Sequence, residues 1–173
     1  MNKLKISNNI DEILDKLWLG NKSAAKDIND LKNKNIKKIL TIMDKDEPKY
    51  NDEDGFKHKI INIKDLSEQN IIKYFGECLN FIKGDDNVLV HCLSGASRSG
   101  SIVIAYVMWI KKMSFNNAFN FVKGKRFIVY PNYGFRQQLK MFEKLLINNE
   151  YDIDKIKFDE IKWEPKEDQL HYL

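Results

Sequence analysis

The chain has 173 residues, of which 43% are hydrophobic and 31% are charged, with a formal net charge of +4. The length indicates one domain, with enough apolar residues for a core. No apolar run approaches the roughly 18 residues of a membrane-spanning helix, so we expect no membrane span. The start lacks the apolar stretch of a signal peptide, and two cysteines make no disulfide framework. These features favour a reducing compartment, the cytoplasm or the nucleus.

Apolar patterns along the chain alternate between the periods of strands and helices. Strands are predicted at residues 17–19, 36–43, 58–63 and 88–91. Helices are predicted at residues 23–34, 67–83, 102–110, 114–123 and 131–146. Ser67 is the expected N-terminal cap of the second helix. Strands that alternate with helices predict a mixed α/β domain.

One segment joins a strand, a loop and a helix and carries reactive side chains. It reads Val90-His91-Cys92-Leu93-Ser94-Gly95-Ala96-Ser97-Arg98-Ser99-Gly100. A loop that enters a helix points N–H groups and the positive end of the helix dipole at its contents. These surroundings favour the thiolate of Cys92, and the Arg98 guanidinium can bind a dianion with two parallel hydrogen bonds. A nucleophile and an anion site in one loop predict covalent phosphoryl transfer.

Three further residues of this segment suit the same chemistry. Gly95 permits a backbone geometry in which N–H groups converge on one anion. The Ser99 hydroxyl is placed to donate to the sulfur, which would help the thiolate to leave a phosphocysteine. His91 is expected to support the loop by hydrogen bonds without contacting substrate.

A cysteine after a strand can instead be a small buried core residue. That interpretation suits Cys78, which lies in an apolar helical stretch at residues 74–82. For Cys92, the arginine and serine at fixed spacing favour a nucleophile. Because disulfide geometry needs Cα atoms within about 7 Å, we expect no bridge between Cys78 and Cys92.

The segment from His91 to Ser99 resembles the signature of the dual-specificity protein phosphatases, a branch of the cysteine-dependent tyrosine phosphatase superfamily. Further blocks match the family in order: Leu17 to Asn21, Ala105 to Met108, Met113 to Phe115 and Pro131 to Phe135. The similarity spans about residues 11–146. Ser94 stands where the family usually has alanine, which removes no required group.

The resemblance implies a three-layer α/β fold, with a mainly parallel central sheet flanked by helices on both faces. It implies a catalytic domain over residues 1–148 and a C-terminal tail over residues 149–173. The phosphate would be bound by Leu93, Ser94, Gly95, Ala96, Ser97 and Arg98. No metal and no other cofactor is required.

The resemblance also implies a proton donor for the leaving oxygen. The family carries an aspartate on a loop before the helix that precedes the cysteine loop. Asp65, ten residues before Phe75, has this position. An isolated aspartate can equally be a solvated loop residue or a helix cap. The other acidic candidates, Asp44, Asp46, Asp52 and Asp54, lie too early in the chain.

The implied activity is hydrolysis of phosphotyrosine and phosphoserine/threonine monoesters in proteins, by a small stand-alone phosphatase. Residues 93–97 contain no Lys, Arg or His, whereas relatives that act on phosphoinositides usually have a basic residue there. Two alternatives remain. One is a phosphatase for a lipid, sugar or nucleotide phosphate, and the other is a catalytically weak phosphoprotein-binding module.

Charge and apolar residues are unevenly distributed near the end of the chain. Residues 151–173 contain seven acidic residues and four lysines, a net charge of −3, so the rest carries +7. The basic cluster at residues 123–126 is either a solvated helix end or part of a positive field that attracts phosphorylated substrates. No aromatic-basic motif supports nucleic-acid binding. The apolar residues of the tail are expected to dock on the domain or on a partner.

Overall fold

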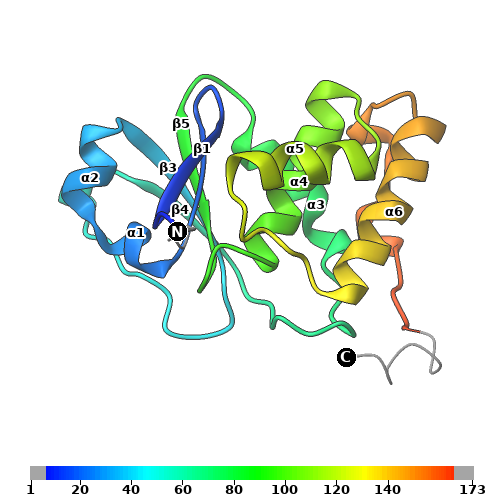
Figure 1. Ribbon diagram of the computed structural model, residues 1–173, viewed down its shortest axis with the longest axis horizontal. Helices are drawn as coiled ribbons and strands as arrows, with labels where there is room; N and C mark the ends of the chain where they lie inside the picture. The colour runs from blue at the N-terminus through cyan, green and yellow to red at the C-terminus, as the bar shows by residue number, and fades with distance from the viewer. Residues whose placement is uncertain (1–6, 166–173) are drawn as a thin grey trace, which may run out of the picture.

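The computed structural model describes residues 7–165, and five strands form a single sheet in its centre (Figure 1). They are β1 (Ile10–Leu14), β2 (Leu17–Gly20), β3 (Ile36–Ile42), β4 (Lys57–Ile61) and β5 (Asn87–His91). Their order across the sheet is β1-β2-β5-β3-β4. β1 runs antiparallel to β2, and the other three neighbouring pairs are parallel. The prediction of a mainly parallel sheet is therefore confirmed.

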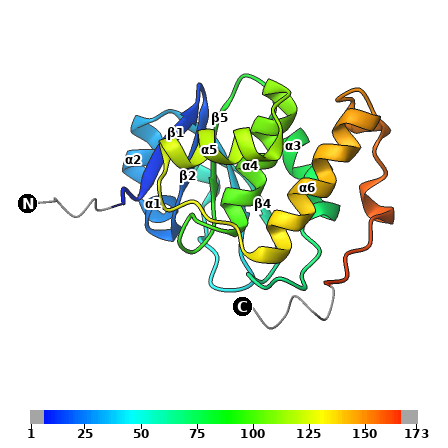
Figure 2. The same cartoon turned by 45° about the vertical axis from the view of Figure 1, so that its right-hand side comes forward.

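Six α-helices cover the two faces of this sheet. They are α1 (Lys22–Lys26), α2 (Ile28–Asn33), α3 (Phe75–Ile82), α4 (Arg98–Lys111), α5 (Phe115–Lys125) and α6 (Tyr133–Asn148). Figures 1 and 2 show α1 and α2 on one side of the sheet and α3 to α6 on the other. The three-layer arrangement expected from the family resemblance is thus present. Within residues 7–165, no helix is both long and apolar enough to cross a membrane.

The core is divided by the sheet into two parts of unequal size. The larger part lies under α3 to α6, and the smaller one under α1 and α2 is built from Ala25, Leu31, Ile36, Ile39 and Leu89. β5 is the central strand: Val88 and Val90 face the larger part and Leu89 the smaller one. Successive side chains of a strand point to opposite faces, so a strand between two helical layers is apolar throughout.

β1 was not predicted from the sequence. Ile10, Ile13 and Leu14 have a spacing typical of a helix, but a register irregularity between Glu12 and Leu14 breaks the strand alternation. This shift places Ile13 in the core at 2% exposure. The strand is an edge strand that pairs only with β2.

Two helix predictions were wrong in their bounds. The helix expected at residues 23–34 is two short helices, because Asp27 ends α1 and its side chain caps α2 at the Asp30 N–H. The helix expected from Ser67 begins only at Phe75, after a short 3-10 turn at Ile72–Tyr74. Ser67 therefore does not cap it.

Residues 149–165 continue from α6 and lie against the domain. They contain two 3-10 turns, Ile153–Lys155 and Phe158–Glu160. Ile153, Ile156 and Phe158 are buried, and Figure 2 shows the segment descending beside α6. The rest of the tail expected at residues 149–173, and residues 1–6 of the expected domain, lie outside the described residues.

Candidate active site

The cysteine segment lies at the carboxyl end of β5, in the middle of the sheet. We call residues 92–98 the phosphate loop. It runs from the last residue of β5, His91, to the first residue of α4, Arg98. In open α/β sheets, ligands bind in the crevice beyond the carboxyl ends of the strands. The buried strand and helix therefore hold the loop at the place where this fold binds ligands.

Cys92 begins the phosphate loop with its thiol nearly enclosed, at 2% exposure. Its Sγ accepts a hydrogen bond from the Gly95 N–H, with N and S 3.3 Å apart. The Ser99 hydroxyl donates to the same sulfur at 3.0 Å. Donors aimed at a sulfur stabilise its thiolate form and equally stabilise it as a leaving group.

Arg98, the last residue of the phosphate loop, is 7% exposed. Both hydrogen bonds that it donates within residues 7–165 come from Nη1, to Asp44 Oδ1 at 2.8 Å and to the Ile63 carbonyl at 3.2 Å. Its Nε is buried and has no hydrogen-bond partner among these residues. Buried donors are nearly always satisfied, so an unpaired Nε beside a cysteine loop suits an anionic ligand.

Asp44 is a residue of the site that the sequence did not reveal. Partial desolvation acts to raise the pKa of Asp44, but the hydrogen bond and charge of Arg98 outweigh it and hold this pKa below its usual range. Asp44 therefore stays ionised near neutral pH. It orients the arginine and is unsuited to donate a proton.

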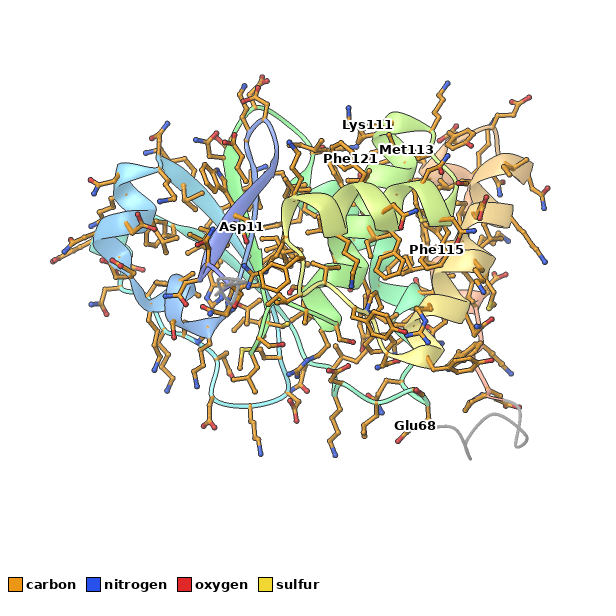
Figure 3. All side chains as sticks on the ribbon, in the orientation of Figure 1. Asp11, Glu68, Lys111, Met113, Phe115 and Phe121 are labelled. Carbon is orange, nitrogen blue, oxygen red and sulfur yellow. The ribbon has the colours of Figure 1, made fainter. Side chains whose placement is uncertain are left out.

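Gly95 has a conformation that no other residue would adopt without strain. Its φ is +70°, and a Cβ there would lie 2.5 Å from the Gly20 carbonyl oxygen of β2. Arg126 holds the same stretch from behind, donating from Nε to the Gly95 carbonyl and from Nη2 to the Ser94 carbonyl. Its Nη1 pairs with Asp11 Oδ2 at 2.7 Å, on β1 (Figure 3).

The remaining residues of the phosphate loop are either exposed or hydrogen-bonded to neighbouring segments. Leu93 and Ser94 are exposed, and Ala96 is half-buried. The Ala96 carbonyl accepts a hydrogen bond from the Tyr130 N–H at 3.1 Å. Ser97 is buried, and its hydroxyl donates to a predicted catalytic residue of another loop.

That residue is Asp65, which the fold brings beside the phosphate loop. Its Oδ1 accepts hydrogen bonds from the Ser97 hydroxyl at 2.7 Å and from Asn132 Nδ2 at 2.9 Å. Asn132 is the N-cap of α6. Both bonds go to Oδ1, which leaves Oδ2 of an exposed side chain available to carry a proton. From the sequence, Asn132 is predicted only to lie at the start of a helix.

The described geometry is that of a known family. The family model for the "Dual specificity phosphatase, catalytic domain" matches residues 17–145. The chain belongs to the dual specificity phosphatase family. It is accordingly a dual-specificity protein phosphatase, a phosphoric monoester hydrolase.

Individual relatives agree with this match. The chain is 39% identical to "Dual specificity protein phosphatase 1B" of Arabidopsis thaliana, over 81% of this chain and 85% of that relative. It is 43% identical to "MAP kinase phosphatase with leucine-rich repeats protein 1" of Dictyostelium discoideum, over 78% of this chain but only 16% of that relative. Thus it spans most of the first relative and about a sixth of the second. The crystal structure of DUSP15 superposes with a TM-score of 0.76 at 32% identity, over 87% of this chain and 99% of that one.

His91 of this phosphatase supports the loop from within the core. Burial lowers the pKa of His91 to about 4, so the ring is neutral near pH 7. Its Nδ1 lies 3.1 Å from the Cys92 carbonyl, which can only accept, so Nδ1 carries the proton. The bare Nε2 then accepts from the Thr41 hydroxyl at 2.7 Å, and Thr41 in turn accepts from His58 Nε2 at 2.8 Å. Of these hydrogen bonds, the one to the Cys92 carbonyl reaches the phosphate loop.

Cys78 is a buried residue of a helix, as predicted from the sequence. It lies in α3, fully buried in the core, and both cysteines are free thiols. Burial raises the pKa of the Cys78 thiol far above its usual range, which makes it a poor nucleophile.

Proposed function

We propose that this phosphatase hydrolyses phosphotyrosine and phosphoserine/threonine monoesters of proteins through a phosphocysteine intermediate. The observation that carries the proposal is the surroundings of Cys92. Its sulfur receives two hydrogen bonds in a loop that also holds a buried arginine with an unpaired Nε. A nucleophile and a candidate anion site belong to the same loop, as a covalent displacement at phosphorus requires.

In the first step the Cys92 thiolate attacks phosphorus. The S–P bond forms as the bond from phosphorus to the leaving oxygen breaks. Arg98 and the loop N–H groups stabilise the charge on the three equatorial oxygens. Asp65 gives its proton to the leaving oxygen, and Ser97 and Asn132 hold its carboxyl group in place.

In the second step water hydrolyses the phosphocysteine. Asp65, now ionised, takes a proton from the attacking water. The O–P bond forms and the S–P bond breaks, which releases inorganic phosphate. The hydroxyl of Ser99 donates to the departing sulfur, and its 3.0 Å contact in the free enzyme supports this role.

Phosphoproteins are the substrates that the site suits best. The exposed residues of the phosphate loop, Leu93 and Ser94, carry no positive charge for the additional phosphates of a phosphoinositide. We propose that the protein works in a reducing compartment, the cytoplasm or nucleus, because oxidation of the Cys92 thiolate would inactivate the enzyme. A lipid, sugar or nucleotide phosphate is the alternative substrate class.

The test is turnover of an aryl phosphate and of a panel of phosphopeptides, with and without vanadate. Cys92→Ser should retain less than about 1% of the wild-type rate, on the scale of nucleophile knockouts. The variant should still bind vanadate or tungstate, since Arg98 and the loop N–H groups remain. Cys78→Ala is the matched control and should keep wild-type turnover.

Two outcomes would contradict the proposal. Residual turnover well above 1% in Cys92→Ser would exclude this nucleophile. A wild-type protein that binds phosphopeptides without turning any of them over would instead be a binding module.

A further inference from the structure

We propose that the segment after α6 positions the general acid, with Trp163 as the residue that reaches it. We call residues 150–165 the tail segment and residues 65–70 the acid loop. The inference rests on the proposed function, because it takes Asp65 as the proton donor. The family model ends its match at residue 145, so the tail segment lies beyond the part that this chain shares with the family model.

The tail segment has a fixed path along the domain. Ile153, Ile156 and Phe158 are buried at 4%, 8% and 9% exposure. The Phe158 ring lies 6.0 Å from that of Phe142 and fills the space beside Gly76, where a Cβ would approach the ring to 2.6 Å. At the start of the segment, Trp109 Nε1 donates to the Tyr151 carbonyl at 2.9 Å.

The last residues of the tail segment form hydrogen bonds with the acid loop. Trp163 Nε1 donates to the Ser67 carbonyl at 2.7 Å, across 96 positions of the chain. Asn70 Nδ2 donates to the Ile161 carbonyl at 2.8 Å. Figures 1 and 2 show the tail segment running beside α6 to the end where the chain after β4 passes, and Figure 3 labels Glu68 of the acid loop there.

The bonded residue, Ser67, is two positions from Asp65 and is itself 4% exposed. Its hydroxyl accepts a hydrogen bond from the Gly134 N–H at 3.2 Å, at the start of α6. A Cβ on Gly134 would collide with the backbone of Ser67, so helix and loop are in direct contact. The Ser67 backbone is thus held between α6 on one side and the indole of Trp163 on the other.

This arrangement matters because the Asp65 side chain is exposed. Among residues 7–165, two hydrogen bonds to one carboxylate oxygen orient it, so its distance from the leaving oxygen depends on where the loop backbone lies. Acid catalysis requires hydrogen-bond distance to that oxygen, and a displacement of about 1 Å can cost about 10²-fold in rate. A bond that fixes the backbone two residues away therefore affects the acid.

The experiment compares two tryptophan variants that each lose one indole N–H. Trp163→Phe removes the donor to the acid loop, and Trp109→Phe removes the donor at the start of the tail segment. The measurement is kcat and KM for a series of aryl phosphates whose leaving phenols range from weakly to strongly basic. Thermal unfolding of each variant is recorded alongside.

Trp163→Phe should lose about 10-fold in kcat/KM for phenyl phosphate and less than about 2-fold for p-nitrophenyl phosphate, since kcat/KM reports the transfer to Cys92 and only a poor leaving group needs the acid in that step. Asn70→Ala should reproduce this pattern. Trp109→Phe should keep the wild-type dependence on the leaving group, whatever its thermal stability.

Several results would overturn the proposal. One is an equal loss on all substrates in Trp163→Phe, which indicates a merely structural role, and another is no loss at all. Leaving-group selectivity that appears equally in Trp109→Phe would assign the effect to packing of the whole tail segment. Asp65→Asn distinguishes failure of the proposed acid from failure of the proposed tail contact. If Asp65→Asn shows no leaving-group selectivity, the assignment of the acid is wrong. If Asp65→Asn is selective and Trp163→Phe is not, only the role of the tail contact is refuted.

Discussion

The phosphate loop and the acid loop differ in where their stabilising contacts come from. The sulfur of Cys92 receives its two hydrogen bonds from residues three and seven positions away in the chain. The carboxylate of Asp65 receives its two from residues 32 and 67 positions away. The first loop is mostly buried, whereas Ser67 is the one fully buried residue of the second.

This difference separates two tasks. The nucleophile and its anion site must be preorganised before substrate arrives, and a buried strand–loop–helix unit supplies that rigidity. The acid must reach the leaving oxygen of substrates of different shape, so it lies at the surface and is positioned by remote segments. Variants of the first loop should therefore slow the transfer to Cys92 with every substrate, and variants of the second should slow that transfer only with substrates that need the acid.

The largest loss is expected for Arg98→Lys. Lysine lacks the planar fork and cannot reproduce both the Asp44 contact and the anion contacts. Turnover should fall by about 10³–10⁵-fold, the range that a transition-state arginine contributes in phosphoryl transfer. Initial rates on phenyl and p-nitrophenyl phosphate should fall by the same factor. A loss confined to one of these substrates would contradict the expected difference between the phosphate loop and the acid loop.

Asp65→Asn should cut turnover of poor leaving groups by about 10²–10⁴-fold. A good leaving group departs without a proton, so its rate should change far less. Values of kcat/KM across an aryl phosphate series measure the difference, because kcat/KM reports the transfer to Cys92 and not the later hydrolysis, in which Asp65 acts as the base. Equal losses on good and poor leaving groups would show that Asp65 is not the acid, and Asp46→Asn is the control from the preceding loop.

Gly95→Ala should disturb the phosphate loop without removing any functional group. A Cβ would meet the Gly20 carbonyl at 2.5 Å and the Arg126 guanidinium at 2.8 Å, at a φ of +70°. Strain of this kind costs about 1–3 kcal/mol. We expect lower stability to denaturant and a loss of at least about 10-fold that is the same for all leaving groups. Gly124→Ala, where a Cβ meets nothing within 4 Å, is the matched control.

The last prediction concerns stability and not turnover, and it tests the pH dependence of the support of the phosphate loop. Burial lowers the pKa of His91 from 6.5 to about 4, so the unfolded chain binds a proton more readily than the folded one. The stability from neutral His91 is complete above about pH 6.5 and is lost as the pH falls toward 4. At about 1.4 kcal/mol per pH unit, the loss approaches about 3 kcal/mol.

Urea unfolding between pH 7 and 4 measures this loss. His91→Asn should show a shallower decline than the wild type across that range. The pKa of His58 is also lowered, chiefly by burial, so His58→Asn gives the contribution of the second ring. Parallel pH profiles for wild type and His91→Asn would contradict the assignment of a buried neutral histidine.

The sequence predicted the parts of the molecule that are local. The β5–loop–α4 unit was predicted because Cys92, Arg98 and Ser99 are contiguous with an apolar strand and helix. The helices expected from residues 114 and 131 begin within two residues of those positions, after the N-caps Ser114 and Asn132, since capping depends on a few neighbouring residues.

The parts that were missed depend on long-range contacts. Ser67 looked like a cap for its own helix, but its hydroxyl accepts from Gly134 at the start of α6 instead. Gln138 of α6 accepts from the N–H groups of Ile71 and Ile72, so a distant side chain binds the backbone just before α3. Asp44 and Arg126 carry no local signal, because their partners lie 54 and 115 positions away.

The pairing of Arg126 with Asp11 bears on where a minimal fragment can start. The family model's match begins at residue 17, and a fragment cut there would lack β1 and its carboxylate. Arg126, at 1% exposure, would then hold an uncompensated charge behind the carbonyls of Ser94 and Gly95. Removing one partner of a buried ion pair costs about 3–5 kcal/mol. The edge strand is therefore part of the smallest unit that can hold the phosphate loop in shape, although it contributes no atom to the reaction.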